Sequence, residues 1–236
     1  MKILKMVNCI TLTGLFLGAY GNSVFAAQKR SIPVQNVYTP AGFDSNDNSQ
    51  IIISGYMPNY CYNTPQAIVD TRNFEITVNM EANYNEEGFC QEATKEYLHV
   101  LDLGKMKPGH YQITIYGDNE FPIEEEIEIA APNAGEIDRY QYPVIHNVSY
   151  NHADKKLLIK GYKPSSCYEL IDVEFYSDRK NTIIALPILE KVSDFCPKKM
   201  VETEISIVTP RLVNSLQTLI HIRSEKKDSK NLEIIF

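Results

Sequence analysis

The sequence predicts an all-β protein in which one antiparallel unit is present twice, each copy with its own disulfide. Three observations support this prediction. Two distant ten-residue segments match, two pairs of cysteines have equal spacing, and short runs of alternating apolar and polar residues recur along the chain. No stretch of similar length has apolar residues repeating with the period of a helix, so helices are not expected.

An internal duplication explains the matching segments. Residues 53–62 align without a gap on residues 159–168, 106 positions later, with identical residues at six of the ten positions. In the same register Phe89-Cys90 aligns with Phe195-Cys196. We interpret this as a repeat of one structural unit.

The duplication also predicts the cysteine pairing. Four cysteines allow three connectivities, but a repeated unit that folds by itself closes its own bridge, which favours Cys61–Cys90 and Cys167–Cys196. Each bridge closes a loop of about 30 residues and is worth roughly 3–4 kcal/mol in the chain-entropy model. A redox pair would normally show Cys-x-x-Cys spacing, which is absent from the sequence.

Each copy contains seven predicted strands bounded by turn residues. In the first copy they are Val34–Thr39, Gln50–Tyr56, Ala67–Thr71, Phe74–Met80, Tyr97–Leu103, Tyr111–Tyr116 and Glu124–Ala130. In the second they are Ile145–Tyr150, Lys156–Tyr162, Ile171–Tyr176, Thr182–Leu189, Thr203–Val208, Gln217–Arg223 and Asn231–Phe236. Seven short antiparallel strands per ~100 residues predict a β-sandwich. The predicted domains are 27–131 and 144–236, joined by a short linker, 132–143, that forms a restricted hinge.

The first 26 residues have the zones of a secretory signal peptide: Lys2 and Lys5, then an apolar run, then small residues before a cleavage point after Ala26. The apolar run is too short for a membrane span, and Cys9 lies inside it rather than at its end. Removing the signal changes the formal net charge from −7 to −9, which disfavours nucleic acid and anionic lipid as partners. We expect a periplasmic or extracellular protein that is soluble after cleavage.

The segment from Leu103 to Ile113, with the sequence LGKMKPGHYQI, resembles the entry to the sixth strand of bacterial immunoglobulin-like sandwiches, where a turn precedes a corner tyrosine. The second copy has Thr209-Pro210-Arg211-Leu212 at this place and lacks both the glycine and the tyrosine. The resemblance implies two tandem immunoglobulin-like antiparallel β-sandwich domains, each with one internal disulfide. The short cysteine spacing and the absence of tryptophan distinguish them from antibody domains. A shared fold of this kind implies no function.

Motifs for catalysis, metals or cofactors are absent from the sequence, so we expect none of these and do not expect an enzyme. Asp44-Ser45-Asn46-Asp47-Asn48 resembles the start of a calcium loop but lacks its glycine and its final glutamate, so a solvated hairpin tip is expected. Adjacent glutamates at 86–87 and 124–126 are expected to be surface charge. His99 and His221 lie in strand runs, where half-exposed histidines are common; the others are His110, His146 and His152.

Tyrosines crowd the first cysteine. Tyr60 and Tyr62 flank Cys61, whereas the second copy repeats Tyr62 as Tyr168 but replaces Tyr60 with Ser166. One interpretation is that these rings pack around the cystine. The other is an aromatic platform for sugar or peptide formed by Tyr60, Tyr62 and Tyr84.

These observations favour an exported binding or interaction module for a protein or glycan ligand. One alternative is a periplasmic chaperone or assembly factor that presents a strand edge to clients. Such proteins often use several basic anchors at the interdomain cleft, whereas here only Arg139 lies near it, which counts against this alternative. The other alternative is a secreted enzyme whose active site follows no known motif.

Overall fold

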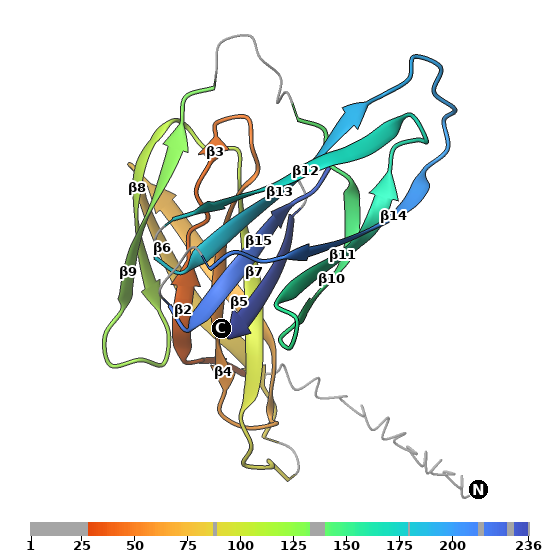
Figure 1. Cartoon of the computed structure of the whole chain (residues 1–236). Helices are drawn as coiled ribbons and strands as arrows, with labels where there is room; N and C mark the ends of the chain where they lie inside the picture. Colours follow the sequence, from red (N-terminus) through yellow and green to blue (C-terminus); the bar gives the residue numbers. More distant parts are fainter. Residues whose placement is uncertain are drawn as a thin grey trace, which may run out of the picture.

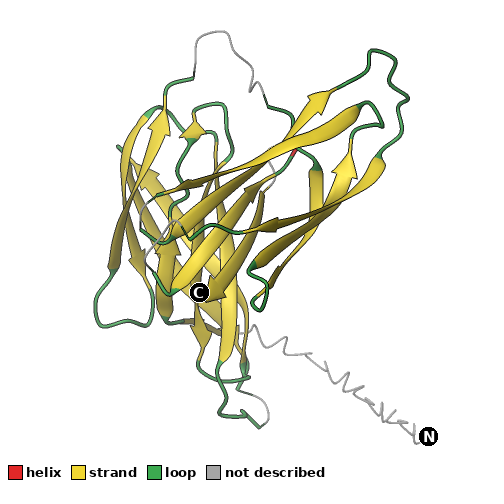
Figure 2. Cartoon of the chain, viewed as in Figure 1, coloured by secondary structure: helices red, strands yellow, loops and turns green. Residues whose placement is uncertain are grey.

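The structure is a computed structural model that describes residues 28–86, 89–132, 140–178, 180–211, 215–225 and 229–235. The regular elements of these residues are β-strands, without an α-helix (Figures 1 and 2). The all-β prediction is therefore confirmed. The predicted signal peptide, Arg139 and most of the predicted linker lie outside the described residues.

The first sandwich consists of two sheets. Strands β2, β4 and β7 form the smaller sheet in that order, and the larger sheet has the order β5-β6-β8-β9-β3, with β1 beside the end of β6. The strands are β1 (Gln28–Ser31), β2 (Val34–Tyr38), β3 (Phe43–Asp44), β4 (Ser49–Met57), β5 (Tyr62–Arg72), β6 (Glu75–Tyr84), β7 (Lys95–Gly104), β8 (Gly109–Tyr116) and β9 (Ile123–Ala130).

The second sandwich repeats this plan. Strands β10, β11 and β14 form a three-stranded sheet, and β12-β13-β15-β16 form a four-stranded one. The strands are β10 (Val144–Asn151), β11 (Lys156–Lys163), β12 (Tyr168–Ser177), β13 (Thr182–Lys191), β14 (Val201–Val208), β15 (Gln217–Arg223) and β16 (Ser229–Ile235).

Every predicted strand is present, and the structure adds β1 and β3, which are too short to show a pattern in the sequence. Most strand pairs are antiparallel. Each copy has one equivalent parallel pair, β6 with β8 in the first and β13 with β15 in the second. The short β3 also pairs parallel to β9. The three-stranded sheet of each sandwich is thus antiparallel as predicted, whereas the larger sheet is mixed. The sequence could not show this, because alternation reports which face is buried and not which strand is the neighbour.

Alternation along the strands builds the two cores. In β9, Ile127 and Ile129 are buried while Glu124, Glu126 and Glu128 are exposed, as the sequence predicts. Each sandwich encloses its own cluster of buried apolar side chains, which come from both of its sheets. Their removal from water supplies the main favourable contribution to folding of each copy.

The repeat extends to details of the backbone. Gly55 in β4 lies opposite Val34 and Gly161 in β11 lies opposite Ile145, each beside a shift of strand register. A Cβ atom at Gly55 would lie 2.2 Å from the Pro33 carbonyl oxygen, and one at Gly161 would lie 2.3 Å from that of Val144. Any side chain at either position would therefore force the same close strand contact apart.

The expected tyrosine corner is present in the first copy. The Tyr111 hydroxyl donates a hydrogen bond of 3.0 Å to the carbonyl of Lys107, four residues upstream. The turn uses Gly104 and Gly109, whose φ angles of 72° and 151° lie in the region that favours glycine. This bond fixes the entry of β8 and matches the resemblance drawn from the sequence.

The two sandwiches pack against each other along β2, β3 and β4 of the first and β15 and β16 of the second (Figure 1). Tyr38, Ile52 and Leu219 form a fully buried cluster between them. Glu233 accepts hydrogen bonds from the Tyr38 hydroxyl and, at 2.8 Å, from the Ser54 hydroxyl. Burial and the hydrogen bond to Glu233 raise the pKa of Tyr38 above its ordinary value.

Two predicted surface features lie at this interface. Asp47, expected at a solvated tip, forms a 3.4 Å ion pair with Arg223 of the second sandwich, and both side chains are largely buried. Glu125 forms a 2.8 Å ion pair with Lys180 of the second sandwich. The solvated tip expected around Asp47 was wrong, because the packing of one copy on the other cannot be deduced from the local sequence. The glutamates remain surface charge as expected, since Glu124 and Glu126 are exposed and the partner of Glu125, Lys180, is 59% exposed.

Candidate functional site at the cystine end of the first sandwich

Both predicted disulfides are present and lie at equivalent ends of the two sandwiches. Cys61 and Cys90 have Cα atoms 5.3 Å apart, and Cys167 and Cys196 have theirs 5.4 Å apart. Each bond ties the residue before β5 or β12 to the loop that follows β6 or β13. The cystine end of the first sandwich, defined as residues 59–62, 84–86 and 89–91, is the candidate site.

A tight turn presents the first half-cystine in each copy. The Asn59 side chain accepts a 3.0 Å hydrogen bond from the Cys61 N–H, and the Ser165 hydroxyl accepts one of 3.2 Å from the Cys167 N–H. Such side-chain turns favour a fixed bend at the start of a strand. The backbone of this end is therefore held both by covalent and by hydrogen bonds.

Tyr62 and Tyr84, two of the three predicted site tyrosines, come together. They are direct cross-strand partners in β5 and β6, and their ring centroids lie 4.8 Å apart. The Arg30 guanidinium, from β1, lies 3.7 Å from the centroid of the Tyr84 ring and forms an ion pair with Glu86. The result is a pair of phenol rings tilted by 59° with a guanidinium over one of them, an arrangement whose remaining ring surface suits a planar partner group.

Two further aromatic side chains project from the same end. Tyr60 is 58% exposed and Phe89 is 92% exposed, and each immediately precedes a half-cystine. The Tyr60 N–H donates to the Gln91 carbonyl at 3.2 Å, which fixes this turn against the loop that carries Phe89. Large apolar groups exposed on a backbone that a disulfide holds are typical of interaction surfaces.

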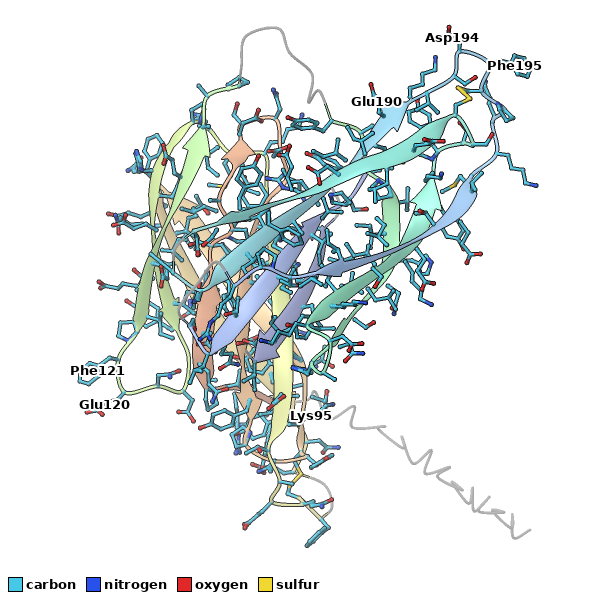
Figure 3. The ribbon with its side chains drawn as sticks, viewed as in Figure 1. Lys95, Glu120, Phe121, Glu190, Asp194 and Phe195 are labelled. Carbon is cyan, nitrogen blue, oxygen red and sulfur yellow. A yellow bond between two sulfur atoms is a disulfide. The ribbon has the colours of Figure 1, made fainter. Side chains whose placement is uncertain are left out.

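The second sandwich carries a different surface at its equivalent end. Phe195 is 88% exposed at the tip of the loop, beside the disulfide (Figure 3). However, Tyr168 lies opposite Lys191 rather than opposite a second tyrosine, and Ser166 replaces Tyr60. The exposed phenylalanine is therefore common to both copies, whereas the ring pair belongs to the first alone.

The side chains of the site are of kinds that can bind a ligand. Its tyrosines supply ring faces and hydroxyl groups, and Arg30 supplies a guanidinium that is shared with Gln28 and Glu86. Among the described residues, no group of three or more His, Cys, Asp or Glu side chains is arranged to hold a metal ion. The described part of the chain contains no helix that is long and apolar enough to cross a membrane.

The histidines lie apart from this site. Burial lowers the pKa of His99, in β7, and His110 lies 3.8 Å from Glu128. His146 and His152 contact the rings of Tyr162 and Tyr150 respectively. His221 is fully buried, contrary to the expected half exposure, because the first sandwich covers this part of β15.

Sequence reasoning missed Arg30 and Phe89. The repeated Phe-Cys dipeptide was a signal for Phe89, because a residue kept beside the cystine in both copies needs a reason. Arg30 had no signal, since it reaches Tyr84 only through pairing of the short β1 with β6.

Comparison with known proteins supports the fold. Residues 51–129 match the ORF11 beta-sandwich domain, a stretch that runs from β4 to β9 of the first sandwich. No curated protein and no solved structure matches the chain significantly. The match confirms a β-sandwich.

Proposed function

We propose that this protein is an exported binding module that contacts a protein or glycan ligand through the cystine end of its first sandwich. The observation that carries the proposal is the aromatic surface there, with Tyr60 and Phe89 exposed beside the half-cystines and the Tyr62 and Tyr84 rings in contact with each other. Aromatic and arginine side chains dominate the binding energy of many interfaces. A disulfide that fixes their backbone reduces the entropy lost on binding.

Export is supported by two independent features. The first 26 residues have the pattern of a signal peptide. The two disulfides suit an oxidising compartment, since cytosolic thiols are normally kept reduced. Fractionation of the native host is expected to place the mature chain in the periplasm or the medium, and an uncleaved chain in the cytosol would contradict export.

Tip variants of the full mature chain test the binding site. The double variant Tyr60→Ser with Phe89→Ser gives the first tip the residue that the second copy has at position 166, and both side chains are exposed, so the fold is expected to persist. Captured proteins and glycans from the host envelope and medium are compared with those of the unchanged chain by mass spectrometry. We expect at least a tenfold loss of the specific ligand.

Phe121 provides a matched control. It is 72% exposed on the loop between β8 and β9, away from either cystine (Figure 3). Phe121→Ser removes a comparable exposed ring and is expected to leave capture unchanged. Equal loss from both variants, or no loss from the tip variant, would overturn the proposed site.

A strand-edge chaperone remains the second candidate because the outer strands of the larger sheets are exposed. β5 pairs with β6 alone and β12 with β13 alone among the described strands, and Ile68 and Ile171 on them are 50% and 55% exposed. Pro65, within β5, and the left-handed Thr64 before it interrupt this edge, as in strands that are protected from further pairing. Loss of client capture in Ile68→Lys, with the tip variant unaffected, would favour the chaperone.

A further inference from the structure

A groove of about 430 Å³ lies where the two sandwiches meet, separate from both cystine ends. Its volume falls in the usual range for small-molecule sites. Its lining comes from the turn around β3 of the first sandwich, the connection before β10, and strands β12, β13 and β15 of the second. The groove therefore exists only while the two copies are packed together.

Three tyrosines from two different segments line this groove. Tyr140 and Tyr142 come from the connection between the sandwiches and Tyr176 from β12, while Ile184 and Leu186 of β13 add an apolar wall. Tyr140 and Tyr176 are 45% and 53% exposed, so their rings are accessible to a ligand. Accessible phenol rings give flat apolar faces with a polar edge.

An ion pair supplies the polar side of the groove. The Arg223 guanidinium donates a 2.9 Å hydrogen bond to the Gly42 carbonyl and lies 3.4 Å from the Asp47 carboxylate. Arg223 also lies over the Phe43 ring, with its Cζ atom 4.5 Å from the centroid. A guanidinium has five N–H donors and a carboxylate has about four acceptor positions, so both groups keep capacity for a ligand while they hold each other in place.

We propose that this interdomain groove binds a neutral saccharide of one or two hexose units. A hexose presents an apolar C–H face, which suits the rings of Tyr140 and Tyr176, and hydroxyl groups that need a donor and an acceptor, which Arg223 and Asp47 provide. The two charges neutralise each other, so an acidic sugar gains no net attraction here. The net charge of −9 on the mature chain disfavours acidic sugars further.

The saccharide fits the observations better than a peptide does. An extended peptide is normally bound through backbone hydrogen bonds to a sheet edge, whereas this groove offers ring faces and one charged pair. The inference does not depend on the cystine end, which shares no lining residue with the groove.

The test uses the full mature chain with a panel of neutral saccharides: methyl glucoside, methyl galactoside, methyl mannoside, N-acetylglucosamine, maltose, cellobiose and lactose. Binding is detected by saturation-transfer NMR and quantified by calorimetry. We expect at least one saccharide to bind, and Tyr176→Ala and Tyr140→Ala to weaken it at least tenfold. Tyr176→Phe, which keeps the ring, is expected to bind within threefold of the unchanged chain.

Tyr116→Ala is the matched control, because Tyr116 is 46% exposed on β8 and does not line the groove. It is expected to leave binding unchanged, as is the tip variant at Tyr60 and Phe89. The inference is overturned if no saccharide of the panel binds the folded chain, or if binding persists in both groove alanine variants. The inference is also overturned if a saccharide that binds is displaced by short peptides but not by the other sugars of the panel.

Discussion

His221 shows how the contact between the sandwiches acts on a single residue. Its Nδ1 lies 2.7 Å from the Asn231 side-chain oxygen, which accepts the hydrogen bond from a neutral ring, and Nε2 is buried without a partner among the described residues. Burial lowers the pKa of His221 to about 3, with a further contribution from the Arg223 charge, while the bond to Asn231 opposes the shift. The ring therefore stays neutral in the folded protein under mildly acidic conditions.

We expect stability to fall as the pH decreases from 6.5 towards 3. In that range His221 takes up a proton in the unfolded chain but not in the folded one, so the unfolded state binds more protons and each lower pH unit favours unfolding. The contribution of His221 to stability is present in full above pH 6.5. Below that pH, the free energy of unfolding falls by roughly 1 kcal/mol for each pH unit. Urea midpoints between pH 7 and pH 4 measure the slope.

His221→Phe removes the titrating group and is expected to flatten this slope, although the Asn231 oxygen loses its donor and overall stability falls. His152→Gln changes an exposed histidine and is expected to keep the slope of the unchanged chain. Equal slopes in the unchanged chain and His221→Phe would show that other groups cause the acid sensitivity.

Gly55 and Gly161 give a second prediction at the residue scale. Alanine at either position would place a Cβ atom within about 2.3 Å of a neighbouring carbonyl oxygen, so the strands must separate locally. We expect Gly55→Ala and Gly161→Ala each to lower the free energy of unfolding by about 1–3 kcal/mol, as overpacking usually does. Urea denaturation measures this, with the exposed Ser206→Ala as control.

If either glycine variant stays within about 0.5 kcal/mol of the unchanged chain, the ordinary range for surface substitutions, the strand contact is less tight than described.

At the scale of elements, each disulfide closes a segment of the same length, since both cysteine pairs are separated by 29 positions. The strands enclosed are β5 with β6 and β12 with β13, the hairpins that form the outer part of each larger sheet. The disulfides therefore limit the freedom of equivalent hairpins in the unfolded chain.

Replacing both cysteines of one pair by serine is expected to lower the stability of that sandwich by roughly 3–4 kcal/mol, with a similar loss for either pair. Denaturation curves measure the loss, and intact mass before and after reduction confirms which bridge remains. A much larger loss for one pair than for the other would show that native-state packing, rather than loop length, sets the contribution.

Prediction from sequence succeeded for elements whose signal is local. Alternation in β9 and the turn at Gly109 mark their elements without reference to the rest of the chain. β1 and β3 were missed because four and two residues cannot display a period, and they exist through pairing with β6 and β9. The parallel pairing of β6 with β8 was missed for a different reason. Which strand is the neighbour depends on residues far apart in the chain, and the local pattern does not show it.

At the scale of the whole molecule, the interface holds the two sandwiches in one arrangement. Glu233 and Arg223 make polar contacts to the first sandwich, and Leu219 packs in the buried cluster with Tyr38. Hydrogen bonds to charged groups contribute about 1.5–3 kcal/mol each, so the interface couples the unfolding of the two copies.

We expect the mature chain to unfold in one calorimetric transition and the double variant Glu233→Ala with Arg223→Ala to unfold in two. Small-angle scattering is expected to show a larger radius of gyration for that variant. Glu128→Ala, which removes an exposed acid near His110, is the control and keeps one transition. A single transition and an unchanged radius in the double variant would show that the apolar cluster alone fixes the arrangement.

The sequence by itself determined the duplication, both cysteine pairs, the core strands and the tyrosine corner at Tyr111, because each depends on spacing along the chain. It also proposed Tyr62 and Tyr84 as members of one site, and the register of β5 on β6 brings their rings together. Only the tertiary structure decided the mixed pairing, the burial of His221 and the groove beside Arg223. These features join residues that are distant along the chain, and no local pattern of residues records which surfaces meet.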